Sequence, residues 1–228
     1  MSNCLTQAQF VQKESSMGLI TTSTDGHFTF WDLTPVLDPF YTITPSTLSL
    51  KQPITAMETP AIISCESRYQ IHSNSIKSVE LAQVSDSTSL IVAGGDDNAL
   101  TFSLLDTALT NSGFGDTRVQ TVTIPDAHTA SVTTIKIIEH NTSHVEGEGA
   151  DAMVDLTVAS SGNDHRVKVW SVQVNMAKDG VDAIQVGNLV DHYSPVADIS
   201  SLDVVRGKME KEVKLLVCGV GMEMVKVR

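Results

Sequence analysis

The chain has 228 residues, 41% of them hydrophobic and 18% charged, which suits one globular domain, or part of a larger one, with a sizeable buried core. Its formal net charge of −12 disfavours an extensive direct grip on RNA or DNA, which needs Lys and Arg to neutralise phosphates, and favours a protein partner. No apolar run is long enough to cross a bilayer and MSNCLTQAQFVQKESS carries no secretion signal, so we expect a cytoplasmic protein, or a nuclear one, without a membrane span.

The apolar residues mostly alternate with polar ones or form short β-branched runs bounded by Gly, Asn and Asp, which predicts an all-β chain. The predicted strands, in chain order, are Leu19–Thr24, His27–Leu33, Ile76–Val84, Leu90–Gly94, Ala99–Leu105, Val119–Ile124, Val132–Ile138, Leu156–Ser160, Arg166–Val172, Ile184–Leu189 and Val213–Val217. Their spacing is short and regular except at two predicted insertions, residues 34–60, rich in Pro, Thr and Ser, and the acidic residues 139–155.

One sequence unit is repeated three times along the chain. The copies are GLITTSTDGHFTFWDL at 18–33, LIVAGGDDNALTFSLLD at 90–106 and LTVASSGNDHRVKVWSV at 156–172. Each has an apolar strand, a tight turn carrying Asp and an alternating strand, and Asp25 and Asp164 each stand six residues before a Trp. Asp97 keeps this register in the middle copy, where Ser103 takes the Trp position.

A His lies upstream of two copies, at His72 and His128, and His192 begins a fourth, weaker unit. This order of His, strand, strand, Asp turn and strand with Trp resembles the WD40 repeat from about residue 18 to the end of the chain. Because such a repeat takes roughly 40–45 residues and propellers have 4–8 blades, the resemblance implies a β-propeller of about four blades, an incomplete or fragmentary ring from a longer protein or an incomplete gene model. The expected blade cores are 18–33, 72–124, 128–190 and 192–228.

The resemblance also implies roles for individual residues. In WD40 repeats a buried His bonds the Asp of the next tight turn, and a Ser or Thr and the Trp complete the network, which is structural and not catalytic. The matching residues are His128, Ser160, Asp164 and Trp170 in a full set, His72 and Asp97 in a partial set, and Asp25 and Trp31 in a set without an obvious His. The family's wrapping places loops 72–75, 96–98, 128–131, 164–166 and 192–195 on one rim, and the two insertions on the opposite face.

No catalytic residue, cofactor, metal or small-molecule substrate is expected, although two segments raise the question. Val217-Cys218-Gly219-Val220-Gly221 matches the strand and glycines that begin a nucleotide- or adenosylmethionine-binding domain, but a final hairpin with a glycine turn is favoured. His140 and His144 could present metal ligands on a helix, but the nearby Gly147 and Gly149 favour a solvated acidic loop. No G-x-S-x-G nucleophile motif occurs.

Residues 70–228 resemble one family of WD repeat proteins more closely, WD repeat-containing protein 6 and its fungal counterparts, especially in the ending HYSPVADISSLDVV and LLVCGVGMEMVKV. This resemblance implies a non-catalytic scaffold that partners a tRNA ribose 2′-O-methyltransferase acting on the wobble nucleotide of the anticodon loop. Two alternatives remain: a general WD40 scaffold in signalling, trafficking or ribosome assembly, and an enzyme whose catalytic site lies in a missing N-terminal region.

Basic residues gather near the end of an otherwise acidic chain. Residues 201–228 hold six Lys or Arg against four Asp or Glu. The only candidate RNA contacts are therefore Arg206, Lys208, Lys211, Lys214, Lys226 and Arg228, and the favoured interpretation of this segment is a solvated edge of the last blade.

Overall fold

The computed structural model describes residues 3–13, 16–34, 65–110, 113–143, 153–178, 180–206 and 213–227. Within them the chain forms four antiparallel sheets, which we call blades 1 to 4 in chain order. Blade 1 holds β1 (Leu5–Lys13), β2 (Ser16–Ser23), β3 (His27–Asp32) and β4 (Cys65–Gln70), and blade 2 holds β5 (Ile76–Gln83), β6 (Thr88–Gly95), β7 (Leu100–Thr110) and β8 (Gly113–Ile124). Blade 3 holds β9 (Val132–Ser143), β10 (Met153–Gly162), β11 (Arg166–Asn175) and β12 (Ile184–Tyr193), and blade 4 holds β13 (Ala197–Arg206) and β14 (Val213–Val227).

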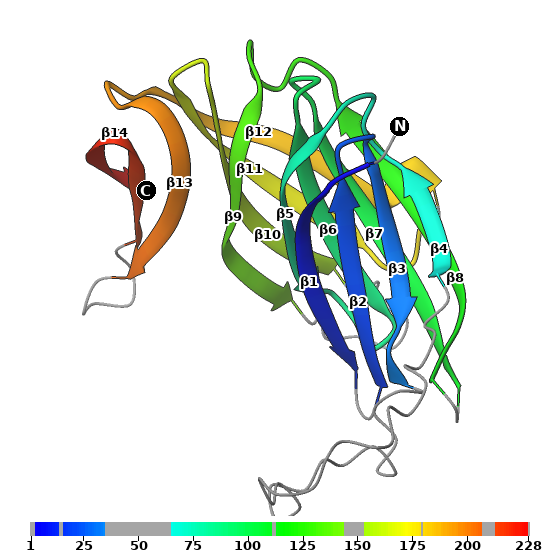
Figure 1. The fold of residues 1–228 in the computed structure, drawn as a ribbon. Helices are drawn as coiled ribbons and strands as arrows, with labels where there is room; N and C mark the ends of the chain where they lie inside the picture. The colour runs from blue at the N-terminus through cyan, green and yellow to red at the C-terminus, as the bar shows by residue number, and fades with distance from the viewer. Residues whose placement is uncertain are drawn as a thin grey trace, which may run out of the picture.

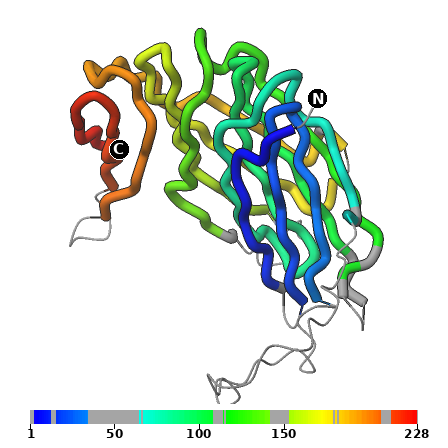
Figure 2. Tube along the Cα trace, in the orientation of Figure 1, coloured from blue at the N-terminus to red at the C-terminus, as the bar shows by residue number. Residues whose placement is uncertain are grey.

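The blades stand side by side in an arc, from blue blade 1 to orange and red blade 4 (Figures 1 and 2). The first strand of each blade contacts the first strand of the next, so β1, β5, β9 and β13 line the inside of the arc. Within each four-stranded blade the spatial order of the strands follows the chain. The predicted all-β class with about four radial blades is therefore confirmed. Among the described residues no helix is long and apolar enough to span a membrane.

The hydrophobic core lies between the blades and is divided into three clusters. Ile20, Phe28 and Phe30 of blade 1 pack against blade 2. Blade 2 packs against blade 3 through Val92 and Phe102. The third cluster joins blades 3 and 4. Because a middle blade is covered on both faces, β6 is buried along its whole length, and its sequence is a continuous apolar and small-residue run without alternation.

Each blade has two faces, which we name by what they meet. The leading face packs on the preceding blade; in blade 3 it carries Leu156, Val158 and Trp170. The trailing face packs on the following blade; in blade 2 it carries Val92 and Phe102. Every contact inside the arc therefore joins a trailing face to a leading face.

Three strands, β1, β4 and β13, have no counterpart among the strand ranges predicted from the sequence. In β1 the side chains that face blade 2 include Gln7 and Gln9, which bond the backbone of Val79: its N–H donates to Gln7 Oε1 at 2.8 Å, and its carbonyl accepts from Gln9 Nε2 at 2.7 Å. A polar inner face of this kind lacks the apolar alternation that identifies a strand. Blade 1 consequently extends beyond the expected core at 18–33.

The two predicted insertions differ in what the structure describes. Residues 35–64, most of the first, lie outside the described residues. In the second, β9 continues to Ser143 and β10 begins at Met153, and these two residues are register partners, so strands occupy both ends of the expected 139–155 segment. Both connections leave from strand ends opposite the Asp turns, because β3 and β9 run away from that end.

Replacing Phe102 by Ala should lower the free energy of unfolding by about 3–5 kcal/mol, because Phe102 is fully buried between blades 2 and 3 and its loss leaves a cavity. Urea unfolding followed by circular dichroism measures the change. Leu189→Ala is the control, since Leu189 is 60% exposed and its truncation should cost little. Equal losses for the two variants would contradict a core placed between the blades.

Candidate functional site

Four buried side chains of blade 3 form one chain of hydrogen bonds. His128, in the loop before β9, places Nδ1 3.0 Å from Asp164 Oδ1 and Nε2 2.8 Å from Ser160 Oγ. Trp170 Nε1 donates to the same Ser160 oxygen at 2.9 Å. His128 and Ser160 are both fully buried. The structure thus brings together all four residues of the full set suggested by the sequence.

The protonation of this network follows from burial and hydrogen bonding. Burial lowers the pKa of His128 against the opposing pull of Asp164, so the imidazole is neutral near pH 7. Burial alone would raise the pKa of Asp164, but hydrogen bonds from His128 and the Thr129 N–H outweigh it and hold that pKa below its usual value. A carboxylate only accepts, so Nδ1 carries the imidazole proton and Nε2 accepts from Ser160. Trp170 therefore donates to Ser160, Ser160 donates to His128, and His128 donates to Asp164.

Blade 2 contains a related network with its hydroxyl on the neighbouring strand. His72 Nδ1 lies 2.8 Å from Asp97 Oδ1, and His72 Nε2 lies 3.1 Å from Thr101 Oγ1. The position that corresponds to Ser160 is Ala93, which has no hydroxyl. Ala93 and Thr101 are register partners, so the missing group is supplied from directly across the strand pair. Thr101 was not among the residues suggested by the sequence.

The substitution of Ser103 for Trp in blade 2 has a local consequence. Ser103 Oγ lies 2.7 Å from Thr121 Oγ1 of β8 and takes no part in the bonds of His72. Blade 2 therefore has the His and Asp pair, but the residue at its Trp position, Ser103, bonds separately to Thr121.

A glycine two residues before the acid makes room for the imidazole. A Cβ atom on Gly162 would lie 2.8 Å from both Asp164 Oδ1 and His128 Nδ1, and one on Gly95 would lie 3.1 Å from His72 Nδ1. Blade 1 has Ser23 at this position, and the Ser23 hydroxyl donates to Asp25 Oδ1 at 2.5 Å. The serine thus occupies the place that an imidazole takes in blades 2 and 3.

Blade 1 brings its two suggested residues into separate bonds. Asp25 accepts from Ser23, which is the main cause of its lowered pKa, and also from Asn3 and Arg68. Trp31 Nε1 donates to Thr21 Oγ1 at 2.9 Å, as Trp170 donates in blade 3. Asp25 and Trp31 are therefore held by different partners. His27 Nδ1 lies 3.2 Å from Asp25 Oδ1, but among the described residues no His bridges Asp25 to the hydroxyl that Trp31 bonds.

Blade 4 uses a glutamate that sequence reasoning missed. His192 Nε2 lies 3.0 Å from Glu223 Oε1, and Gly221 precedes Glu223 by two residues with a φ of 118°. The spacing of glycine and acid equals that of Gly95 with Asp97 and of Gly162 with Asp164, and it was the signal available in the sequence. The role of the glycine differs, because a Cβ atom on Gly221 would meet no neighbour within 4 Å.

The glycine segment 217–221 lies within β14 and pairs with β13. A Cβ atom on Gly219 would lie 2.4 Å from the Ala197 carbonyl oxygen, so the neighbouring backbone explains this glycine. The arrangement fits a final hairpin and has no helix after the glycines among the described residues, as a nucleotide-binding turn requires.

The other candidate residues are placed as follows. His140 is exposed on β9, and His144 lies outside the described residues. Within the described part of the chain no three His, Cys, Asp or Glu side chains are grouped to hold a metal. Arg206 Nη2 donates to the Ile138 carbonyl at 2.7 Å, which ties β13 to β9. Of the other suggested RNA contacts, Lys214 and Lys226 lie on β14 and have partners, and Lys208, Lys211 and Arg228 lie outside the described residues.

Successive blades are linked at the end of the arc that carries the Asp turns. The residue after each turn Asp has a positive φ, at 79° for Gly26, 65° for Asn98 and 60° for His165. The carbonyl of each accepts an N–H from the segment leading into the next blade: Gly26 from His72 at 3.1 Å, Asn98 from His128 at 3.1 Å and His165 from Ser194 at 2.8 Å. The turns and the entry loops therefore share one end, which we call the rim.

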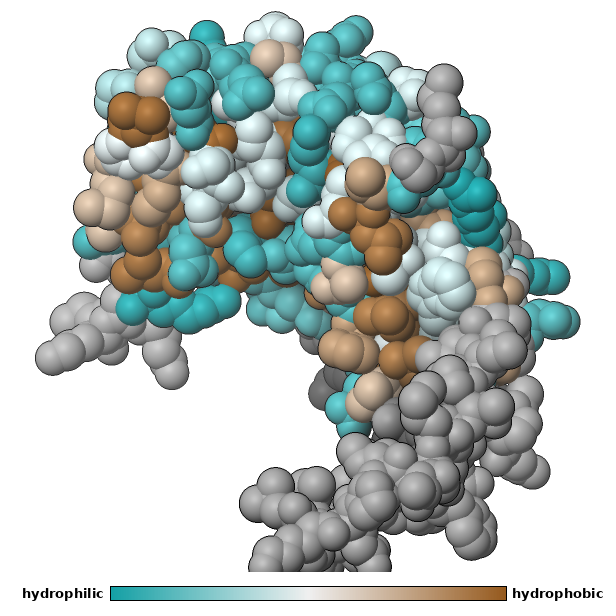
Figure 3. Space-filling view, in the orientation of Figure 1, coloured by the Kyte–Doolittle hydropathy of each residue, from teal (hydrophilic) through white to brown (hydrophobic). Residues whose placement is uncertain are grey.

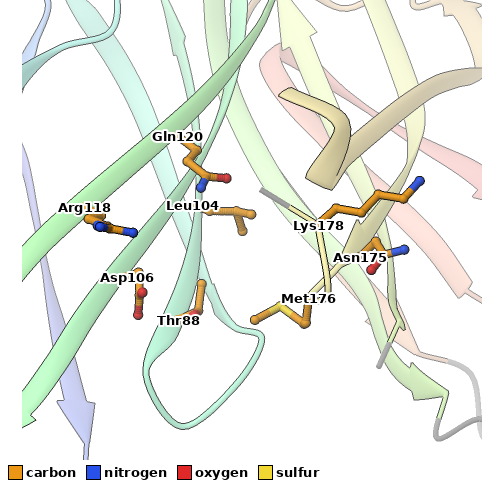
Figure 4. A pocket seen from close by; sticks show the side chains of 8 residues that line it. All are labelled: Thr88, Leu104, Asp106, Arg118, Gln120, Asn175, Met176 and Lys178. Atoms are coloured by element: carbon orange, nitrogen blue, oxygen red, sulfur yellow. The ribbon is translucent and has the colours of Figure 1, made fainter. Parts of the chain in front are cut away.

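A small pocket lies at the opposite end, between blades 2 and 3 (Figure 4). Its lining residues are Thr88, Leu104, Asp106, Arg118, Gln120, Asn175, Met176 and Lys178. Asp106 and Arg118 are register partners on β7 and β8, so charges of both signs stand side by side. Gln120 is already engaged, since its Oε1 accepts from the Gly180 N–H at 3.0 Å. The pocket thus presents no single charge that would select a ligand.

The radial sheets and the repeated His and acid pairs resemble the blades of a WD40 β-propeller. Residues 118–171 match the WD40 family, described as WD domain, G-beta repeat, and this match supports the assignment. The matched residues include the complete network from His128 to Trp170. WD40 repeats are typical of protein-interaction scaffolds. No curated protein matches the chain.

The stability of blade 3 should depend on pH through His128. Below pH about 6.5 the imidazole of the unfolded chain takes up a proton while the folded one, with its lowered pKa, does not, so acid weakens folding. The carboxyl of Asp164 also has a lowered folded pKa, and its contribution is lost at still lower pH. The stability difference between the wild type and His128→Gln should therefore be largest near pH 7 and narrow towards pH 5. Urea unfolding across this range measures it, and a gap that widens in acid would mean that the folded imidazole is charged.

In blade 2, Thr101→Val should lower the free energy of unfolding by about 1–3 kcal/mol, because it leaves the buried His72 Nε2 without its partner while keeping the side-chain shape. Adding Ala93→Ser should restore part of the loss by placing a hydroxyl at the position that Ser160 has in blade 3. Thermal melting of the single and double variants tests this, with Ala93→Ser alone as the control. A double variant no more stable than Thr101→Val would refute the exchange of hydroxyls.

Proposed function

We propose that the chain is a non-catalytic scaffold subunit that binds a protein partner at its rim. The observation that carries this proposal is the repeated bonding of turn to entry loop, which holds the rim loops of successive blades in one fixed arrangement. Preorganised loops on a rigid framework bind with a smaller loss of conformational entropy than mobile ones do. The buried His residues are engaged in holding these loops, and we assign them no chemical step.

The rim of blade 3 carries the side chains that we expect to contact the partner. Tyr193 is 60% exposed, and the guanidinium carbon of Arg166 lies 5.9 Å from the centre of its ring. The His165 ring stacks on the same tyrosine with centroids 6.1 Å apart. Tyr and Arg are the residue types that most often dominate binding energy in protein interfaces. An ordered and exposed group of this kind is suited to anchor a partner.

The partner that we propose is a tRNA ribose 2′-O-methyltransferase acting on the wobble nucleotide. The support for this finer assignment is the resemblance of residues 70–228 to WD repeat-containing protein 6 and its fungal counterparts. In the proposed division of labour the enzyme supplies adenosylmethionine and catalysis, and the scaffold orients enzyme and tRNA. The acidic charge of −12 favours contact through protein over a direct grip on tRNA phosphates. We place this function in the cytoplasm.

We expect Tyr193→Ala combined with Arg166→Ala in the tagged full-length protein to lower the amount of methyltransferase that co-purifies, because the exposed ring and its cation are both removed. Lys178→Ala is the matched control, since Lys178 is exposed at the opposite end of blade 3. Quantitative mass spectrometry of the purified complexes measures the change. Equal recovery with both variants would remove the partner from this part of the rim.

The finer assignment is tested separately by mass spectrometry of tRNA nucleosides from a deletion strain. Lowered 2′-O-methylation of the wobble nucleotide supports the methyltransferase partnership. Unchanged methylation together with a different stable complex would instead establish a general WD40 scaffold, in signalling, trafficking or ribosome assembly. Turnover by the purified protein alone would overturn the non-catalytic role.

A further inference from the structure

Blade 1 is covered on its trailing face but not on its leading face. Ile20, Phe28 and Phe30 on the trailing face are fully buried against blade 2. The leading face carries Phe10, which is 67% exposed, and the partly exposed Leu19, Phe10's register partner. The leading face of blade 1 is therefore an apolar sheet surface without a neighbour among the described residues.

This surface corresponds residue by residue to one that is buried elsewhere in the arc. Leu19 stands six residues before Asp25, as Val158 stands six before Asp164, and their cross-strand partners are Phe10 and Ile137. In blade 3 the corresponding face packs on blade 2, where Val158 is fully buried and Trp170 is 5% exposed. The leading face of blade 1 is thus built as an interface between blades.

The other end of the arc carries the complementary kind of face. On β14, Val213, Leu215 and Val217 point into the cluster between blades 3 and 4. The exposed apolar residues of β14 belong to the other, trailing face and are Val220 at 70%, Met222 at 75% and Met224 at 53%. In the space-filling view apolar surface shows both over blade 4 and over blade 1 across the arc (Figure 3).

From these two faces we propose that two copies of the chain close a ring, with blade 1 of each copy packed on blade 4 of the other. Every contact inside the arc joins a trailing face to a leading face, and the described residues leave one of each unpaired. Such a contact is heterologous, and repeating it about a two-fold axis closes the assembly. Two copies bring twice the four sheets of one chain, which is within the 4–8 blades of known propellers.

Two further features match the faces to each other. Among the described residues blade 4 has only the two strands β13 and β14, which are its inner ones. The most exposed apolar residues of blade 1, Leu5 and Phe10, lie on its innermost strand, β1. Residues 5–12 of β1 and 16–23 of β2 contain no Asp, Glu, Lys or Arg, and Lys13 at the end of β1 is the one charged residue of the two strands. Apart from Lys13, no charge of these two strands would lose its water when the faces meet.

The test is the mass of the purified 228-residue protein in solution, by light scattering coupled to size exclusion. We expect twice the 24.5 kDa of one chain. Phe10→Glu and Met222→Lys should each yield the mass of one chain, because each charge falls in both contacts of the symmetric ring. Leu189→Glu is the control and should leave the dimer intact, since Leu189 is 60% exposed on β12 and belongs to neither face.

An equimolar mixture of Phe10→Glu and Met222→Lys gives the sharpest result. In a mixed pair one contact carries both new charges, which are of opposite sign, and the other contact is unaltered, so the mass should return to that of a dimer. A wild-type protein of single-chain mass would overturn the proposal. So would masses above the dimer, dissociation by Leu189→Glu, or a mixture that stays dissociated while both variants keep the wild-type circular dichroism spectrum. The proposal is independent of the partner proposed for the rim.

Discussion

The hydrogen bond between His128 and Asp164 is the interaction on which the arrangement of the blades depends most directly. Both groups are polar, and the blade that carries them is packed on both sides, so each must find a partner inside the protein. The bond joins the loop before β9 to the turn after β10, and the Ser160 and Trp170 side chains extend it across the sheet. Entry loop, turn and third strand are thereby held as one unit, and the following loop bonds to the turn.

Comparison of the four blades shows what this constraint requires. The acid needs a donor, and in blades 2 and 3 the donor is an imidazole for which a glycine leaves space. In blade 4 an imidazole also pairs with the acid, but a Cβ atom on Gly221 would meet no neighbour within 4 Å. Where Ser23 replaces the glycine, its own hydroxyl fills the place. The second ring nitrogen needs a hydroxyl, but Ser160 and Thr101 show that either strand of the pair can provide it. Each buried polar group thus needs a hydrogen-bond partner, but different residues at different positions can supply that partner.

The division of the core has a consequence for function. Because the apolar residues lie between blades, each blade depends on its neighbours, and the end blades each carry one interblade face that the described residues do not cover. The polar networks lie at the rim end of the same interfaces. One set of contacts therefore stabilises the fold and orients the rim loops, which suits the proposed binding of a protein partner at the rim.

The sequence by itself determined the all-β class and the number of blades, because local alternation and a repeated unit need no knowledge of distant contacts. The resemblance of that unit to the WD40 repeat also indicated the network of His128, Ser160, Asp164 and Trp170 in blade 3. It did not reveal β1, whose Gln7 and Gln9 are matched to the backbone of another blade. Nor did it reveal Thr101 or Glu223. Thr101 acts because it lies across from Ala93, and Glu223 because β14 brings it to His192. These roles arise from cross-strand register and from strand paths, which join residues far apart in the chain and are decided only when the blades pack.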